Sequence, residues 1–292
     1  TQFGNYVPEN YNKEFDGALD LAIQIFTNTY SRKFMHQLVS GQVDVDRLDY
    51  LKRDSFYTGV TEGNINTDRI VAMMNVDQEQ LVFESKGVHS LEKFLLARRL
   101  MYWQVYLHKT SLAAELILVK ILSRFRILTE SGKESLTDSH VLFPFFNLNK
   151  ASILEESALE TYLTLDDSDI LALLKRWMKH EDIVLSRLSK QLINRDLPKV
   201  KLQSTPISEE AINKKKDRLI HLNISDSISD NFVFSGSVSN QTFTSDQAQI
   251  LLQEKSGKIN SIAKSINYLD FEQFSKPIHK YYLCYPKANS SL

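Results

Sequence analysis

Residues 90–128 read SLEKFLLARRLMYWQVYLHKTSLAAELILVKILSRFRIL and form a long periodic segment. Apolar residues recur every three or four positions, and no proline interrupts the run. Ser90 is placed to cap its start. The pattern predicts one long helix, or two helices separated by a kink.

The same helical spacing extends back to about Asn12, and glycines are few, so the first half of the chain is expected to be mostly helix. A polar loop at residues 129–139 then leads to a second helical group from Ile153 to Ile193. In this group Asp166 and Asp169 have the spacing of a capping box. The first two thirds of the chain are therefore predicted to consist mainly of helices.

After Pro198 the pattern becomes one of strands, with one helix beginning at Ser208. The expected strands are residues 199–202, 231–243, 249–262 (folded about a turn at 255–258) and 278–285. We therefore predict a mainly α fold with a small C-terminal α+β unit. The expected divisions are residues 1–130, 131–197 and 198–292.

The composition narrows the class of protein. The 292 residues are 42% hydrophobic, and 35 Lys and Arg residues against 36 Asp and Glu give a net charge of -1. This balance, without a basic stripe, disfavours nucleic-acid binding. A single cysteine, Cys284, excludes an internal disulfide and is expected to be buried. No apolar run approaches the roughly 18 residues of a membrane span, so a cytoplasmic protein is expected.

Residues 43–60, VDVDRLDYLKRDSFYTGV, carry the first candidate site. On a helix, Asp46, Tyr50, Asp54 and Tyr57 form one polar stripe. Carboxylates suit a hard or borderline metal, and the neighbouring Arg47 suits phosphate oxygens. The competing interpretation is a solvated helix whose acidic side chains pair with its basic ones. Spacing alone favours that interpretation.

Residues 98–109, RRLMYWQVYLHK, carry a second stripe. Arg98, Tyr102, Tyr106 and Lys109 share one helical face at spacings of four, four and three. The cations are candidates to bind a phosphate chain while the tyrosines flank a sugar or base. Core tyrosines with surface cations are an equally good explanation.

Together the two runs, SGQVDVDRLDYLKRDSFYTGV and SLEKFLLARRLMYWQVYLHKT, resemble bacterial HD-superfamily phosphohydrolases related to dNTP triphosphohydrolases. DNFVFSGSVSN and FSKPIHKYYLCYPK extend the resemblance into the C-terminal region. The resemblance implies an HD-type helical bundle. It also implies attack by a metal-activated water on the α-phosphate of a nucleotide, which releases deoxynucleoside and triphosphate.

The resemblance also implies a role for each site residue. In the motif Asp44-Val45-Asp46-Arg47, Asp46 corresponds to the last ligand of a divalent metal. The other implied contacts are Arg47, Arg98 and Lys109 with phosphate, Asp54 with the sugar 3′-hydroxyl, and Tyr50 and Tyr106 with the sugar. Tyr102 and Leu107 replace a His and a Gln of the best-studied members, which leaves base preference open.

The metal site expected from the resemblance is incomplete in this sequence. None of the seven histidines is followed by aspartate, so the upstream His and His-Asp ligands are missing. One carboxylate does not hold a catalytic metal, and we expect this chain to be inactive by itself. Because the chain begins at Thr1, truncation is the expected reason. His36 is expected in a core or capping role, and His108 at the pocket or against a neighbour.

Two classes of function remain open. The first is a metal-dependent nucleotide phosphohydrolase. The second is a noncatalytic module that binds nucleotide or builds an oligomer. Homo-oligomers are expected in either class, because the family assembles in this way and Tyr102, Trp103 and Tyr106 offer surface for it.

Overall fold

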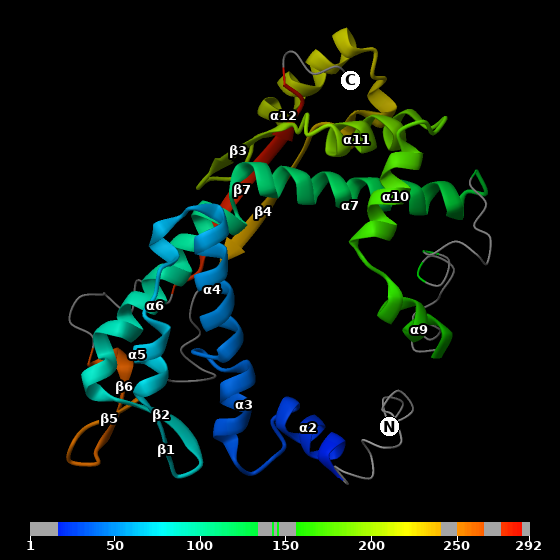
Figure 1. Cartoon of the computed structure of the whole chain (residues 1–292). Helices are drawn as coiled ribbons and strands as arrows, with labels where there is room; N and C mark the ends of the chain where they lie inside the picture. Colours follow the sequence, from blue (N-terminus) through cyan, green and yellow to red (C-terminus); the bar gives the residue numbers. More distant parts are fainter. Residues whose placement is uncertain are drawn as a thin grey trace. The chain divides into compact units, whose positions relative to one another are not determined.

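The computed structural model of the protein describes residues 17–133, 142, 145, 156–240, 250–265 and 276–287. The chain folds into two compact units. The first contains Thr1–His108 and Ser239–Ile278, and the second contains Lys109–Val238 and His279–Leu292. These units differ from the three consecutive ranges expected from the sequence, because the chain returns to the first unit after residue 238. Each unit can be followed by its colours in Figure 1.

The first unit is built mainly from helices. They are α2 (Ala18–Phe26), α3 (Lys33–Ser40), α4 (Val45–Thr58), α5 (Thr67–Ala72) and α6 (Val88–Met101), with short 3₁₀ turns η2 (Thr61–Gly63), η3 (Ser85–Gly87) and η8 (Ile262–Lys264). The helices expected over this half are thus present, although the part before residue 17 lies outside the described residues.

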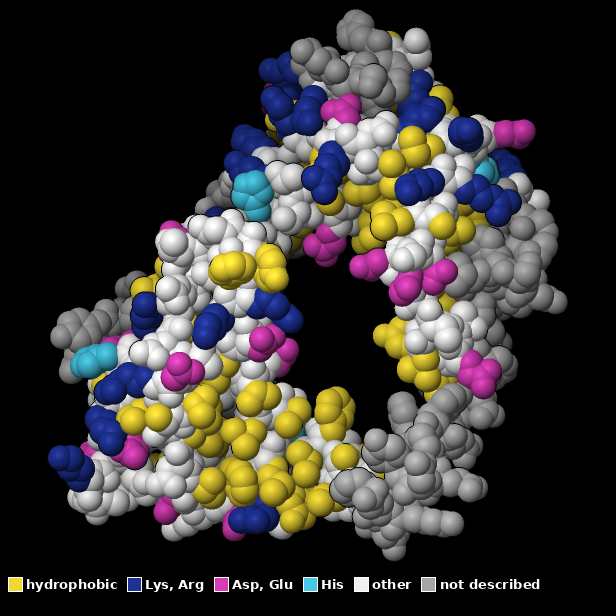
Figure 2. All heavy atoms as spheres, in the orientation of Figure 1, with side chains coloured by type: hydrophobic (Ala, Val, Ile, Leu, Met, Phe, Trp, Pro, Cys, Tyr) yellow, Lys and Arg dark blue, Asp and Glu magenta, His cyan; other side chains and the backbone are white. Residues whose placement is uncertain are grey.

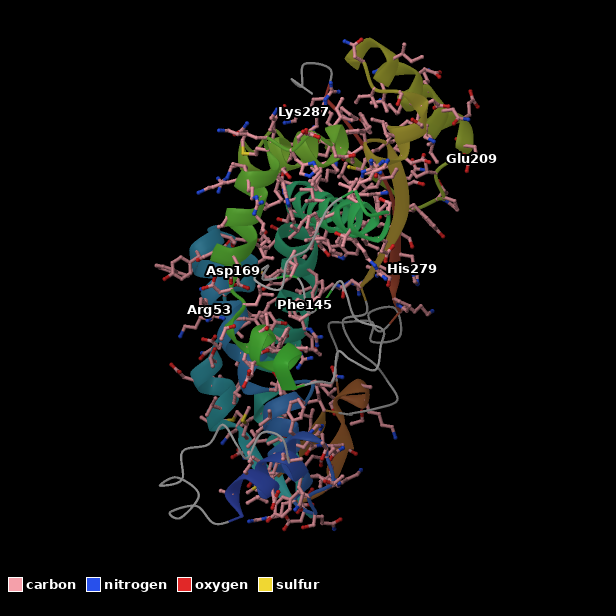
Figure 3. The ribbon with its side chains drawn as sticks, turned by 90° about the vertical axis from the view of Figure 1, so that its right-hand side faces the viewer. Arg53, Phe145, Asp169, Glu209, His279 and Lys287 are labelled. Atoms are coloured by element: carbon pink, nitrogen blue, oxygen red, sulfur yellow. The ribbon has the colours of Figure 1, made fainter. Side chains whose placement is uncertain are left out.

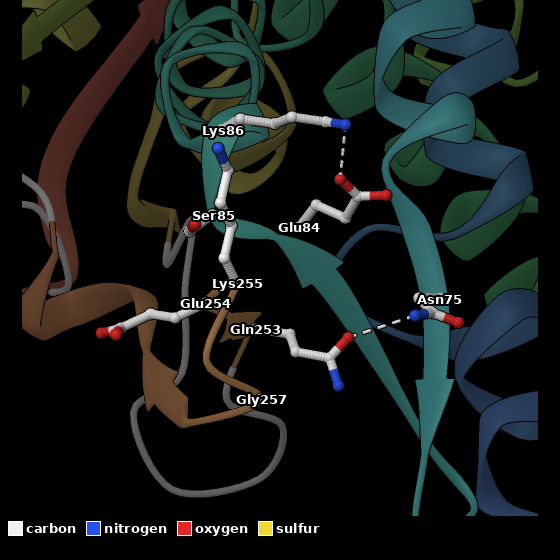
Figure 4. Close-up of a pocket in the computed structure, with 8 residues that line it drawn as sticks. All are labelled: Asn75, Glu84, Ser85, Lys86, Gln253, Glu254, Lys255 and Gly257. Atoms are coloured by element: carbon white, nitrogen blue, oxygen red, sulfur yellow. Dashed lines mark hydrogen bonds and ion pairs between the residues drawn. The ribbon is translucent and has the colours of Figure 1, made fainter.

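A four-stranded sheet in the first unit was not expected. Its order is β1-β2-β5-β6, formed by β1 (Met74–Asp77), β2 (Gln80–Glu84), β5 (Leu251–Gln253) and β6 (Ile259–Ser261). β1 and β2 make an antiparallel hairpin, and β2 pairs in parallel with β5, where Val82 lies opposite Leu251. Asn75 Nδ2 donates to Gln253 Oε1 at 3.1 Å across this sheet (Figure 4). The first half is mostly helix, as predicted, but it also contains the β1–β2 hairpin, which the sequence pattern did not predict.

The long segment at residues 90–128 folds as two helices. α6 begins at Val88 with Gly87 as its N-cap, so Ser90 lies inside the first turn and does not cap the helix. A π-helical segment, η4 (Tyr102–Tyr106), follows α6 directly. α7 (Lys109–Glu130) then begins the second unit. Of the two predicted forms, the interrupted one is confirmed.

The second unit contains further helices besides α7, of which α11 packs directly against it. These are α9 (Glu156–Thr164), α10 (Asp167–Trp177), α11 (Ile183–Ile193) and α12 (Glu209–Lys216), with the 3₁₀ turns η6 (Asp217–Leu222) and η7 (Asp226–Asn231). The predicted capping box is confirmed: Asp166 caps α10, and Asp169 (labelled in Figure 3) accepts from the Asp166 backbone N–H at 3.0 Å. Ser208 caps α12 as expected. Phe125 and Trp177 meet in the core, with ring centroids 4.5 Å apart.

The C-terminal strands form a separate sheet in the second unit. Its order is β3-β7-β4, from β3 (Lys199–Gln203), β4 (Phe234–Asn240) and β7 (Ile278–Tyr285). Cys284 is fully buried, as predicted, and burial raises the pKa of its thiol to about 12. The fold is therefore mainly α with a C-terminal α+β part. The expected strand pair at 249–262 is present as β5 and β6, but it joins the first unit.

The core of the first unit fixes the elements that carry the candidate residues. Leu48 and Leu51 from α4 belong to the same buried cluster as Phe94 and Leu95 from α6. Because interiors are closely packed, this shared core holds α4 and α6 in a defined register.

On the face shown in Figure 2, both basic and acidic side chains lie on the surface of the described residues. Within the described ranges, no helix combines the length and the apolar character that crossing a bilayer requires.

Candidate phosphate-binding site

Helix α4 packs one face into the core and leaves its other faces to polar side chains and to the exposed Val45 and Phe56. Asp44 is the N-cap, and Gly59 ends the helix in a left-handed conformation with φ of 71°. Leu48, Leu51 and Ser55 are buried. The side chains of Asp46, Tyr50 and Asp54 are left on other faces, as the sequence predicted.

A tyrosine and an aspartate from different helical segments meet at the centre of the site. The Tyr106 hydroxyl donates to Asp54 Oδ2 at 2.7 Å. Burial raises the pKa of Tyr106, and the hydrogen bond to Asp54 acts in the same direction. The hydroxyl therefore stays protonated and keeps donating. One Asp54 oxygen is engaged in this way, and the carboxylate retains capacity to accept from another donor.

Two further tyrosine rings, those of Tyr50 and Tyr102, contact the ring of Tyr106. The ring centroids of Tyr50 and Tyr106 are 6.0 Å apart, and those of Tyr102 and Tyr106 are 5.4 Å apart, both edge-to-face. Tyr102 and Tyr106 are the first and last residues of the π-helical segment. Such segments are rare and often occur at functional sites. The rings give a half-buried wall suited to a sugar or base.

Arg98 is a buried cation with unsatisfied donors. Its exposed fraction is 8%, and neither Nε nor Nη1 has a hydrogen-bond partner within the described part of the chain. Burial lowers the pKa of Arg98, and the charge of Arg47 lowers it further. Arg47 also has a buried, unpartnered Nε among the described residues. Because buried cationic donors without partners are costly, these donors favour an anionic ligand.

Asp44 belongs to the site but had no assigned role in the sequence prediction. Its side chain, in a residue only 1% exposed, accepts from the Arg47 backbone N–H at 2.8 Å and pairs with Arg47 Nη1. Burial raises the pKa of Asp44, while Arg47 acts in the opposite direction. Aspartate is a favoured N-cap, so the capping role of Asp44 could be predicted from the sequence, whereas its burial with Arg47 could not.

Three other predicted residues are exposed. Asp46 is exposed in the first turn of α4. Lys109 is exposed at the start of α7 in the second unit, and its contact with phosphate stays a prediction. Tyr57 is 80% exposed and contacts the ring of Phe56. Within the predicted stripe on α4, Asp46 and Tyr57 are therefore exposed, whereas Tyr50 and Asp54 are half-buried.

The competing interpretation of α4 as a solvated, ion-paired helix holds for one pair only. Arg53 and Asp49 are exposed and 3.1 Å apart. Arg47 instead pairs with Asp44, and Asp54 accepts from Tyr106. The face that carries Asp54 is thus built from tertiary contacts, which a simple solvated helix would not need.

Metal ligands do not gather in the part of the chain that the structure describes. No group of three or more His, Cys, Asp or Glu side chains there is placed to hold an ion. Asp44 is engaged by Arg47, and the metal-ligand role of Asp46 stays a prediction. His36 Nδ1 lies 2.9 Å from the Ile25 carbonyl oxygen, in the structural role expected for it. His108 is exposed.

Two hollows on the first unit lie away from this cluster. One of about 380 Å³ is bordered by Asn75, Glu84, Lys86 and Lys255 (Figure 4). The other, of about 670 Å³, is lined by α4 residues that include Lys52 and Phe56. Neither includes Arg98 or Asp54, so the candidate site rests on its unpartnered donors and not on cavity size.

Gly41 holds Arg47 through its backbone carbonyl and lies too close to Gln37 for a side chain to fit. Its carbonyl oxygen accepts from Arg47 Nη1 at 2.8 Å, and a Cβ atom on it would lie 2.1 Å from the Gln37 carbonyl oxygen. Gly41→Ala is therefore expected to lower the unfolding free energy by about 1–3 kcal/mol, the usual cost of overpacking. Chemical denaturation of this variant and of Ser40→Ala, an exposed neighbour, measures the difference. Equal stability of the two variants would show that the backbone relaxes freely.

Comparison with known proteins places the chain in a family. The model of the HD associated region matches residues 65–139. The crystal structure of a phosphohydrolase from Bacteroides thetaiotaomicron superposes with a TM-score of 0.86 and 45% identity, covering 96% of this chain and 70% of that one. The chain belongs to the HD-type phosphohydrolase superfamily.

Two curated relatives match over shorter segments. The uncharacterized protein YwfO of Bacillus subtilis is 37% identical over 174 residues, which are 60% of this chain and 39% of that protein. The deoxynucleoside triphosphate triphosphohydrolase SAMHD1 homolog of Dictyostelium discoideum is 31% identical over 90 residues, 30% of this chain and 17% of that protein. The matched segments therefore span well under half of these relatives.

Proposed function

We propose that this protein binds a deoxynucleoside triphosphate and takes part in its hydrolysis to deoxynucleoside and triphosphate. The observation that carries the proposal is the pair of arginines, Arg47 and Arg98, whose buried donors lack partners among the described residues. Membership of the phosphohydrolase superfamily supports the reaction type. The match to the Dictyostelium protein supports the nucleotide class.

The two arginines are suited to a chain of phosphates. Each guanidinium presents planar, forked donors that match phosphate oxygens. Placed in a site that excludes water, they would offset negative charge that develops on the phosphoryl oxygens as the bond to the α-phosphate breaks. The arginines would therefore act in both binding and catalysis.

The tyrosine wall and Asp54 are suited to the sugar. Asp54 is held by Tyr106 and can still accept a hydrogen bond from a 3′-hydroxyl. Tyr50 and Tyr102 flank Tyr106 by edge-to-face contacts and leave a narrow, partly apolar surface. A deoxyribose ring fits such a surface by packing its apolar face on the rings.

We also propose that Asp46 contributes one ligand to a divalent metal whose other ligands lie outside the described residues. A bound divalent ion lowers the pKa of water and supplies a nucleophile. Homo-oligomer formation stays a prediction.

Tyr106→Phe tests the sugar contact. Without the Tyr106 hydroxyl, Asp54 loses the hydrogen bond that positions it. The preference for a deoxynucleoside triphosphate over its 3′-deoxy analogue should therefore fall about fivefold, because a hydrogen bond contributes ~1 kcal/mol. Affinity for inorganic tripolyphosphate should not change. Calorimetric titration of each ligand measures both quantities, and Tyr57→Phe, an exposed tyrosine, is the control. An unchanged preference would remove Asp54 from the sugar site.

A further inference from the structure

Asp44 has a role that capping alone does not explain. The proposal that follows rests on the proposed function. A helix N-cap needs only a side-chain oxygen, and serine, threonine and asparagine supply one as well as aspartate does. A carboxylate in a residue that is 1% exposed loses most of its hydration, which is costly. Something in the site must therefore compensate for the charge of Asp44.

The compensation comes from Arg47. Asp44 accepts from the Arg47 backbone N–H through Oδ1 and pairs with Arg47 Nη1 through Oδ2. The Gly41 carbonyl oxygen accepts from the same Nη1 at 2.8 Å. Two acceptors thus engage the two hydrogens of a single nitrogen.

This arrangement fixes the whole guanidinium. The group is planar, so holding one nitrogen from two directions defines where its other donors point. Arg47 Nε remains buried without a partner among the described residues. The protein therefore holds Arg47 through Nη1, while Nε is left to donate to a ligand.

We infer that Asp44 is a positioning residue of the phosphate site, acting through Arg47. Asp44 orders a long side chain before the ligand arrives, so that the entropy cost of ordering it is not incurred on binding. Simple charge repulsion predicts the opposite effect, because a carboxylate near the site repels an anion. The two mechanisms therefore predict effects of opposite sign.

The test is a double-mutant cycle on the affinity for inorganic tripolyphosphate, measured by calorimetric titration of the protein. Asp44→Asn keeps a capping oxygen but removes the ion pair. It should raise the Kd by roughly three- to tenfold, the range associated with immobilising one long side chain. In an Arg47→Ala background the same substitution should have no further effect.

Asp182→Asn is the matched control. Asp182 is also an N-cap paired with an arginine, because it accepts from the Leu185 backbone N–H at 2.9 Å and from Arg124 Nε at 3.0 Å. It belongs to the second unit. Its substitution should leave tripolyphosphate affinity unchanged, and thermal unfolding of both variants shows whether any loss of affinity comes from loss of fold.

Each outcome decides the inference. Tighter binding by Asp44→Asn, or an equal loss in the Arg47→Ala background, would overturn the positioning role. If Arg47→Ala weakens binding while Asp44→Asn does not, this inference fails and the proposed function survives. If neither Arg47→Ala nor a substitution of Arg98 weakens binding, the proposed phosphate site itself is wrong.

Discussion

Asp46→Ala is expected to abolish divalent-metal-dependent hydrolysis in the full-length protein while leaving its fold intact. Asp46 is exposed in the first turn of α4 and contributes nothing to the buried core, so its loss should not lower stability measurably. If it is a metal ligand, removing it should reduce turnover by several orders of magnitude, because a catalytic site depends on its complete ligand set.

Asp49→Ala is the control for Asp46→Ala. Asp49 is an exposed aspartate of the same helix, paired with Arg53 at 3.1 Å. Surface pairs of this kind contribute about 0–1 kcal/mol, so both turnover and stability should be nearly unchanged. Steady-state rates with added Mg²⁺ or Mn²⁺ measure the effect. Unchanged turnover in the Asp46→Ala variant would show that Asp46 is not a metal ligand.

Arg98→Met is expected to weaken ligand binding and strengthen the fold at once. The variant keeps an unbranched apolar side chain but removes the guanidinium. Loss of one charge-assisted hydrogen bond should lower tripolyphosphate affinity by about 10- to 150-fold, equivalent to ~1.5–3 kcal/mol. Because Nε and Nη1 of Arg98 are buried without partners among the described residues, the unfolding free energy should rise by about 1 kcal/mol.

The opposite signs of these two effects make the Arg98 test specific. Replacing a residue that serves only the fold would lower the stability of the protein and would not weaken binding while raising stability. Arg53→Met is the control, because Arg53 is an exposed cation of the same unit and its loss should change affinity less than about twofold. A fall in stability of Arg98→Met, with affinity unchanged, would show that Arg98 has a structural role that the hydrogen-bond geometry does not reveal.

The sequence predicted the elements that depend on local signals. Asp166 and Asp169 form the capping box expected of them, and Ser208 begins its helix as a cap. These features could be predicted because a cap is satisfied within one helical turn, by residues adjacent in the chain. The β7 strand was likewise visible as an aromatic run bounded by prolines.

The sheet of the first unit could not be predicted in the same way. The β1–β2 turn places Gln78 and Glu79 at φ of 45° and 62°, where Asn-Gly is the usual signal. β2 then pairs with β5, and Val82 and Leu251 are far apart in sequence. Such pairing depends on tertiary contacts, which the spacing of apolar residues along the sequence does not indicate.

The candidate site was predicted in its residue types but not in its contacts. The stripe containing Arg98, Tyr102 and Tyr106 assumed a regular helix, whereas Tyr102 and Tyr106 belong to a π-helical segment. The hydrogen bond from Tyr106 to Asp54 joins residues 52 positions apart. Asp44 was missed because its importance comes from burial with Arg47, which the sequence pattern does not show.

Arg47 and Arg98 together form the proposed phosphate-binding site. Its most direct test is calorimetric titration of the protein with inorganic tripolyphosphate, at low and high salt. We predict saturable binding of one ligand per chain that weakens as salt rises and is lost in the Arg47→Ala, Arg98→Met double variant. No saturable binding, or equal binding by the double variant, would show that Arg47 and Arg98 do not form a phosphate-binding site.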